Sequence, residues 1–211
     1  MFSPIFGLLI AVSPFAWRAD AAAETGTGLV PSGYQDCIAT GHSHGSCVGA
    51  HEGYGACVEK GRSHDSCLGA KGGYGACVRS GSSHASCLDA EAGYGDCLAN
   101  GRRHDSCLSA GAGYGACIRN GRSHESCLRS AGGYEACIKN GRSHAACVDA
   151  QAGYGACIEN HHSHDSCMDA KAGYGDCVRD GQSHDGCLQA PAGYGACIAG
   201  GHSHRSCMTV Q

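Results

Sequence analysis

Large apolar aromatic residues are almost missing from most of the chain. The 211 residues include three Phe and one Trp, and all four lie near the N-terminus, at Phe2, Phe6, Phe15 and Trp17. Beyond this segment the only aromatic side chains besides His are those of nine Tyr. A chain with so few large apolar side chains builds a thin core, and thin cores usually need covalent links to stay folded.

Features that mark particular functions are also scarce. The net charge is −4 with His neutral, without a basic patch of the kind that nucleic acid or an anionic membrane requires. We therefore expect no nucleic-acid partner. An enzyme needs one asymmetric group of nucleophile, base and stabiliser, whereas the polar residues here recur in near-equal copies. We expect no enzymatic activity and no catalytic residues.

The N-terminal segment differs in composition from the rest of the chain. An apolar run from Phe6 to Trp17 is followed by small residues up to Ala23, an order typical of a secretory signal peptide. The run is shorter than the roughly 20 apolar residues of a spanning helix, although a retained membrane anchor is the alternative. We predict a signal peptide over residues 1–23, a linker over 24–32 and a secreted protein with no membrane span after cleavage.

Residues 33–211 contain nine repeats with a period of twenty residues. Each follows G-Y-x-x-C-h-x-x-G-x-S-H-x-S-C-h-x-A-x-x, where h is Val, Leu, Ile or Met. The first Gly, the Tyr, both Cys and the His occur in every copy, while His161 replaces the second Gly once and Arg103 replaces the first Ser once. Repeats of this length indicate stacked units that are each too small to bury an apolar face alone.

The spacing within a repeat favours short helices over strands. Tyr54, Cys57, Val58 and Gly61 fall at i, i+3, i+4 and i+7, which places them on one helical face, whereas a strand would point Tyr54 and Cys57 to opposite faces. Gly61 is expected to end one helix and Ser63 to begin the next. We predict an all-α repeat solenoid of helical hairpins with two short helices per repeat. One longer helix per repeat and an irregular, loop-rich disulfide scaffold are the alternatives.

Cysteine is the most unusual component, since 18 residues recur at every tenth position from Cys37 to Cys207. A secreted, cysteine-rich chain points to disulfides. Pairing within each repeat, as Cys57 with Cys67, gives nine bridges, whereas pairing Cys67 with Cys77 and so on leaves the first and last thiols unpaired. We predict the first scheme and keep bridges between consecutive repeats as its rival. The predicted disulfide cysteines are Cys37, Cys47, Cys57, Cys67, Cys77, Cys87, Cys97, Cys107, Cys117, Cys127, Cys137, Cys147, Cys157, Cys167, Cys177, Cys187, Cys197 and Cys207.

This Cys-x9-Cys spacing resembles that of the twin Cys-x9-Cys helical hairpins of the mitochondrial intermembrane space. In that family two helices are joined by two disulfides, so the resemblance implies short helices that pack together through disulfides. It covers the spacing of the cysteines along the repeats and no other motif.

The repeated His and Tyr each have two candidate roles. His64 lies three residues before Cys67, so both could share a helix face and, with Cys57 across the turn, hold zinc or copper. Those thiols would have to stay reduced, which secretion disfavours, so we expect a packing or hydrogen-bonding His and neither cofactor nor metal. Tyr either fills the core or forms a ridge that stacks on a partner. The candidate binding residues are Tyr54, Tyr74, Tyr94, Tyr114, Tyr134, Tyr154 and Tyr174.

Together these features predict a secreted, non-enzymatic, disulfide-rich repeat protein. It would act as a structural or multivalent binding surface for an unknown protein or carbohydrate partner, because many weak sites together give high avidity. One alternative is an extracytoplasmic Cys/His protein that sequesters zinc or copper. The third candidate is a precursor that is cut into small cysteine-containing peptides, although a dibasic sequence occurs once, at Arg102-Arg103, and not at every boundary.

Overall fold

The structure is a computed structural model that describes residues 33–210, and the predicted signal peptide and linker lie outside these residues. Every repeat in this range forms two short helices, and the described residues contain no strand, so the predicted all-α helical repeat is confirmed. The first helices are α1 (Gly33–Ala39), α3 (Tyr54–Glu59), α5 (Tyr74–Arg79), α7 (Tyr94–Ala99), α9 (Tyr114–Arg119), α11 (Tyr134–Lys139), α13 (Tyr154–Glu159), α15 (Tyr174–Arg179) and α17 (Tyr194–Ala199). The second helices are α2 (His44–Cys47), α4 (His64–Cys67), α6 (His84–Cys87), α8 (His104–Cys107), α10 (His124–Cys127), α12 (His144–Cys147), α14 (His164–Cys167), α16 (His184–Cys187) and α18 (His204–Cys207).

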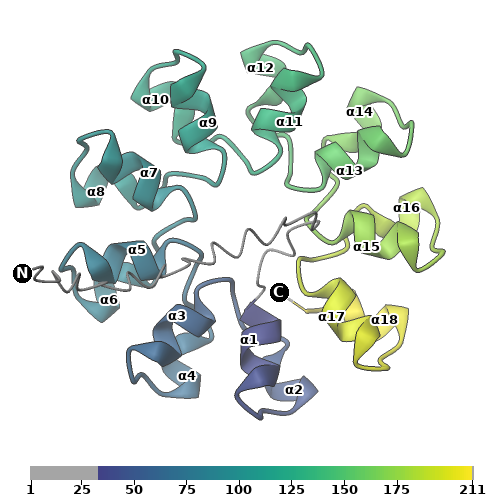
Figure 1. The fold of residues 1–211 in the computed structure, drawn as a ribbon, viewed down its shortest axis with the longest axis horizontal. Coiled ribbons are helices and arrows are strands. Elements are labelled where there is room, and N and C mark those ends of the chain that lie inside the picture. The colour runs from purple at the N-terminus through teal and green to yellow at the C-terminus, as the bar shows by residue number, and fades with distance from the viewer. Residues whose placement is uncertain (1–32, 211) are drawn as a thin grey trace, which may run out of the picture.

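The nine repeats, numbered here as units 1 to 9 from Gly33 to Gly193, form a ring (Figure 1). Each first helix packs against the first helices of its neighbours, and α17 of unit 9 packs against α1 of unit 1. The turns within the units form the outer rim, and the segments that connect successive units face the centre (Figure 1). The solenoid therefore closes on itself and offers a circular surface in place of an extended one.

Two local signals separate the helices of each unit. Gly61 has φ = 74°, a left-handed conformation that ends α3, and every unit has a positive φ at this position. His161, with φ = 64°, is the one non-glycine residue of this kind within residues 33–210. At the start of α2 the Ser43 hydroxyl accepts a hydrogen bond from the Ser46 N–H, whereas Ser63 keeps the extended N-cap conformation without that bond. The chain also leaves the helical conformation between the end of α4 at Cys67 and the start of α5 at Tyr74, which excludes one longer helix per unit.

One disulfide closes each hairpin. The nine bridges run from Cys37–Cys47 to Cys197–Cys207 and join the two cysteines of the same unit. Their Cα atoms are 5.4–5.6 Å apart, within the range that a disulfide requires. No cysteine of the described chain is free, so no bridge connects consecutive units.

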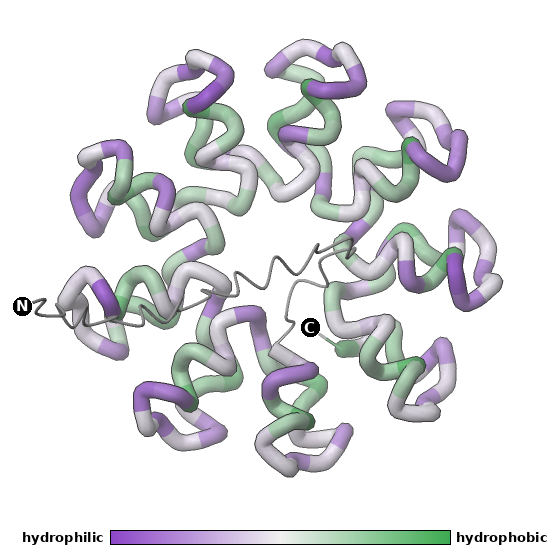
Figure 2. Tube along the Cα trace, in the orientation of Figure 1, coloured by the Kyte–Doolittle hydropathy of each residue, from purple (hydrophilic) through white to green (hydrophobic). Residues whose placement is uncertain are grey.

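The core is a continuous band that follows the ring. In unit 2 the side chains of Tyr54, Cys57, Cys67 and Ala70 are all fully buried, and the same positions are buried in the other units. The aliphatic residue after each cysteine, such as Val58, is partly buried against this band. Hydrophilic residues gather on the outer turns (Figure 2). The thin core is thus made mostly of tyrosine and disulfide sulfur.

Close backbone contacts at the centre explain the first glycine of units 1 to 8. The Gly53 N–H donates to the Ala70 carbonyl at 2.8 Å, and the His51 N–H donates to the Leu68 carbonyl at 3.0 Å. A Cβ atom on Gly53 would collide with the carbonyl oxygens of Ala70 and Lys71. Only glycine allows the two connecting segments to approach this closely.

Candidate functional site

A hydrogen-bonded pair of Tyr and His links the two helices of each unit. In unit 2 the Tyr54 hydroxyl lies 2.9 Å from His64 Nδ1, and the two rings meet edge to face with centroids 5.7 Å apart. All nine units contain this pair, with oxygen–nitrogen distances of 2.7–3.0 Å. The repeated His therefore makes a hydrogen bond at the turn, which holds the second helix against the first.

The tyrosine rings are buried inside the ring of units. Each candidate binding tyrosine is at most 1% exposed, so a partner cannot stack on its face. The predicted ridge of exposed tyrosine is therefore wrong, and burial gives these residues the core-filling role instead. The residues concerned are Tyr54, Tyr74, Tyr94, Tyr114, Tyr134, Tyr154 and Tyr174.

Some tyrosine hydroxyls also bond to the preceding unit, and the partner there sets the direction of the hydrogen bonds. Asn120 Nδ2 donates to the Tyr134 hydroxyl at 3.3 Å, which leaves the tyrosine proton for its histidine. The Tyr194 hydroxyl instead donates to Asp180 Oδ2 at 3.0 Å, so His204 has to donate its Nδ1–H to Tyr194. Burial, together with the hydrogen bond and charge of Asp180, raises the pKa of Tyr194 to about 12.

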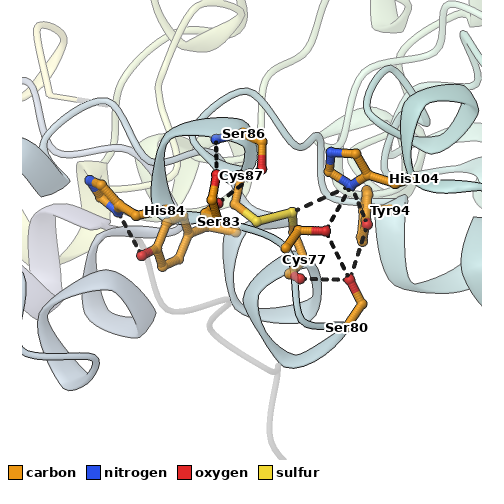
Figure 3. Close-up of a disulfide and its surroundings, with 10 residues drawn as sticks. Cys77, Ser80, Ser83, His84, Ser86, Cys87, Tyr94 and His104 are labelled. Atoms are coloured by element: carbon orange, nitrogen blue, oxygen red, sulfur yellow. Dashed lines mark hydrogen bonds between the residues drawn. A yellow bond between two sulfur atoms is a disulfide. The ribbon is translucent and has the colours of Figure 1, made fainter.

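In three units a disulfide sulfur contacts a histidine of the unit that follows, at Cys37, Cys77 and Cys117. Figure 3 shows the Cys77–Cys87 bridge, where His104 Nδ1 of the next unit lies 3.9 Å from Cys77 Sγ. The Tyr94 hydroxyl lies 2.7 Å from the same His104 nitrogen and 3.3 Å from Ser80 Oγ. Because the cysteines are fully buried, a reductant has to separate two units before it can reach the sulfur atoms.

The Cys/His set considered for a metal ion is engaged in other bonds. Cys57 and Cys67 are joined to each other, and His64 Nδ1 faces the Tyr54 hydroxyl. The described residues include no group of three or more His, Cys, Asp or Glu side chains placed to share a metal ion. A zinc or copper centre on these ligands would require reduction of the disulfide and loss of the Tyr–His bond.

The residue after the turn glycine makes a further contact between units, which the sequence analysis missed. The His42 ring stacks on the His64 ring of the next unit with centroids 3.9 Å apart, and Ser82 Oγ lies 3.2 Å from His104 Nδ1. Both contacts span 22 residues. This position varies among His, Arg, Ser and Gln, so it looks like free surface in the sequence.

Charged residues are unevenly distributed around the rim. We call the exposed arginines in the turns of units 4 to 6 the arginine arc. No carboxylate of the described chain forms an ion pair with them. These units are neighbours on the rim, at α8, α10 and α12 (Figure 1). Four arginines therefore gather on one part of the rim, together with the exposed carboxylates of Asp105 and Glu125 in the same turns. The arginine arc consists of Arg102, Arg103, Arg122 and Arg142.

The centre of the ring holds a cavity of about 580 Å³. The Lys71 ammonium and a Glu91 carboxylate oxygen form an ion pair of 2.8 Å on its wall. Surrounding protein atoms and the charge of Glu91 raise the pKa of Glu52, whose side chain faces the cavity. The wall combines both signs of charge with Gly and Ala residues, so it favours no single ligand class.

Comparisons with models of known protein families, with curated proteins and with solved structures find no match. Among the described helices, none has the length and apolar character needed to cross a membrane. The function is therefore argued from the geometry of the ring and the chemistry of its surface.

Proposed function

We propose that the protein is a secreted, non-enzymatic scaffold whose rim binds an anionic polysaccharide through the arginine arc. The observation that carries this proposal is the contrast between core and rim. The invariant Gly, Tyr and Cys positions are buried, whereas arginines that form no ion pair with a described carboxylate gather in the exposed turns of three consecutive units. A constant scaffold with a variable outer surface is typical of repeat proteins that act by binding.

Secretion is supported by the disulfides and by the N-terminal segment. Disulfides persist in oxidising compartments and are rare in the cytosol, and this chain forms nine of them within the described residues. The apolar run that precedes the repeats has the order of a signal peptide.

A role without catalysis is supported by the repetition of the polar groups. The Tyr–His pair occurs nine times in nearly the same geometry, with each tyrosine hydroxyl buried in hydrogen bonds. A catalytic centre needs one asymmetric group that a substrate can reach. The described residues offer nine equivalent pairs, in each of which the tyrosine is buried away from a substrate.

The arginine arc has the chemistry of an anion-binding surface. A guanidinium group donates two parallel hydrogen bonds to a sulfate or carboxylate, and these charge-assisted bonds are stronger than neutral ones. Arg122 and Arg142 stand at the same position of consecutive units, so their groups repeat along the rim as anionic groups repeat along a polysaccharide. Several such contacts on one rigid ring give avidity, and a stapled scaffold loses little conformational entropy on binding.

The test is retention of the secreted protein on immobilised heparin, a sulfated polysaccharide, at increasing salt. The wild type should bind with an affinity that falls as salt screens the charges. Arg122→Gln with Arg142→Gln should lower the affinity by about tenfold. Gln already stands at this position in unit 8. The matched control, Arg62→Gln with Arg205→Gln, removes the same charge outside the arc and should change the affinity by less than about twofold.

Three results would overturn the proposal. Absence of retention at about 50 mM salt would rule out a sulfated partner. An equal loss of heparin affinity in both double variants would mean that net charge, and not the position of the arginines in the arc, determines binding. Tighter binding to DNA than to heparin would assign a nucleic-acid partner. Separately, many free thiols on the secreted protein, counted by alkylation and intact mass, would contradict the stapled scaffold and favour the metal-binding alternative.

A further inference from the structure

The ends of the ring meet without a covalent bond between unit 9 and unit 1. Helix α17 packs against α1, and the two units close the circle (Figure 1). The His202 ring stacks on the His44 ring with centroids 4.1 Å apart. Ser206 Oγ lies 2.8 Å from His44 Nε2. We call this interface, formed by Tyr34 and His44 of unit 1 and by His202 and Ser206 of unit 9, the seam.

The seam repeats a contact that also occurs within the chain. His42 stacks on His64 with centroids 3.9 Å apart, and His162 stacks on His184 at 3.7 Å. The seam is therefore an ordinary interface between units whose two sides are not consecutive in the chain. At the other interfaces a short connecting segment limits any separation, whereas the seam is held by its non-covalent contacts alone.

Carboxylates are placed differently at the seam than at the internal stacks. The residue after the stacked histidine is Asp65 in unit 2 and Asp185 in unit 8, but Gly45 in unit 1. The two carboxylates of unit 1 lie elsewhere, since Asp36 accepts a hydrogen bond from Gly55 of unit 2 and Glu52 lines the central cavity. Unit 9 has no carboxylate between residues 193 and 210. The titratable and charged side chains of the two units are Tyr34, Asp36, His42, His44, His51, Glu52, Tyr194, His202, His204 and Arg205.

Protonation of His44 also changes the hydrogen bonds of the seam. We assign the neutral ring the tautomer in which it accepts the Tyr34 proton at Nδ1, over 3.0 Å, and donates its Nε2–H to Ser206. A protonated ring has two donors and no acceptor, so the buried Tyr34 hydroxyl loses the acceptor of its proton. The unit 9 residue at the position that bonds to tyrosine elsewhere is Gly200, which has no side chain to replace it.

We propose that the seam is a proton-controlled latch, closed while His44 and His202 are neutral and opened when both are protonated. Imidazole takes up its proton between pH 8 and 5, and two stacked cations repel each other. The internal stacks gain the same charge, but their units stay tethered and an aspartate follows one histidine of each stack, at Asp65 and Asp185. Acid therefore opens the ring at one place. This device is independent of the polysaccharide partner proposed above.

Opening has a chemical consequence at the last disulfide. Both cysteines of the Cys197–Cys207 bridge of unit 9 are fully buried in the closed ring, and Ser206, the residue before Cys207, contacts His44 of unit 1 across the seam. The Cys117–Cys127 bridge of unit 5 lies between two tethered neighbours. The ratio of the reduction rates of these two bridges in one sample therefore reports the state of the seam.

The experiment treats the mature protein with a water-soluble phosphine reductant at about pH 7.5 and pH 5, alkylates the released thiols and maps them by peptide mass. Because both bridges are in the same sample, the effect of pH on the reductant cancels. We expect the rate of Cys197–Cys207 relative to Cys117–Cys127 to rise at least about tenfold at the lower pH. An unchanged ratio, or equal acceleration of all nine bridges, would overturn the proposal.

Two matched variants test whether His202 causes the effect of pH on the ratio of reduction rates. His202→Gln places at the seam the residue that unit 8 carries as Gln182, and the ratio should then be the same at both pH values. His42→Gln makes the same change at an internal stack and should keep the full wild-type response. A response that survives in His202→Gln, or disappears in His42→Gln, would contradict the latch.

Discussion

Removal of one disulfide tests whether the bridges, and not the thin core alone, hold a unit together. Cys77→Ala with Cys87→Ala deletes the bridge of unit 3 without leaving a free thiol. The two cysteines are 10 residues apart, and closing a loop of that length in the unfolded chain corresponds to about 2.7 kcal/mol at 25 °C. Both sulfur atoms are buried, so their loss removes about 1 kcal/mol of packing each. The free energy of unfolding should therefore fall by about 4–5 kcal/mol.

Urea unfolding followed by far-UV circular dichroism measures this change, and hydrogen exchange shows where it acts. Units contact only their neighbours, so the added exchange should concentrate in α5 and α6 and in the interfaces beside them. The same double substitution at Cys157 and Cys167 of unit 7 serves as the matched comparison. Because that bridge closes a loop of equal length, its cost should agree within about 1 kcal/mol.

A loss below about 1 kcal/mol in either unit would refute the reasoning, because the core and the contacts between units would then suffice. Reduction of all nine disulfides tests the same argument at its other extreme. The loop-closure contributions of the nine disulfides sum to about 24 kcal/mol. This exceeds the roughly 5–15 kcal/mol by which folded proteins are usually stable. Complete reduction should therefore abolish the helical signal, and a reduced protein that keeps it would contradict the same argument.

Three further predictions concern single residues. Asp180→Asn should lower the pKa of Tyr194, seen as tyrosinate absorbance at lower pH. In the wild type this interaction stabilises the fold below the unfolded tyrosine value of 10.0 and is lost as pH rises through about 12. Gly73→Ala should cost about 2–3 kcal/mol in urea unfolding, because its Cβ would meet the next connecting segment, whereas Gly69→Ala has open space and should be neutral. Ser130→Ala should raise stability by about 1 kcal/mol in thermal unfolding, since the Ser130 hydroxyl is buried without a partner.

The sequence predicted those parts of the fold that depend on neighbouring residues. A helix ends at Gly61 because a glycine there adopts φ = 74°, and the next one begins at a serine because its side chain and extended backbone suit an N-cap. Cysteine pairing followed from the number of thiols, since pairing within each repeat leaves none unpaired. Each of these features is determined within about ten residues of chain, where residue spacing and backbone conformation determine the structure.

The surface and the contacts between units could not be predicted in the same way. Whether Tyr54 faces a partner or the core depends on how unit 2 meets its neighbours, and a twenty-residue period is compatible with both. The stacking of His42 on His64 appears only when the rotation between units is known. The arginine arc is local to three units, so the average charge of the chain hides it.

Closure of the ring depends on all the interfaces together and cannot be predicted from any single unit. Nine units complete a circle, so each interface rotates the chain by about 40°. Packing angles between helices scatter by about 15–20° among proteins, and because the units repeat, an error at one interface recurs in the same direction at all of them. A deviation of only a few degrees would leave the ends apart or make them collide. The seam shows that the accumulated rotation is correct, since His202 meets His44 at 4.1 Å and 25° while His42 meets His64 at 3.9 Å and 28°. The last interface is thus nearly as well formed as an internal one, although no connecting segment joins its two sides.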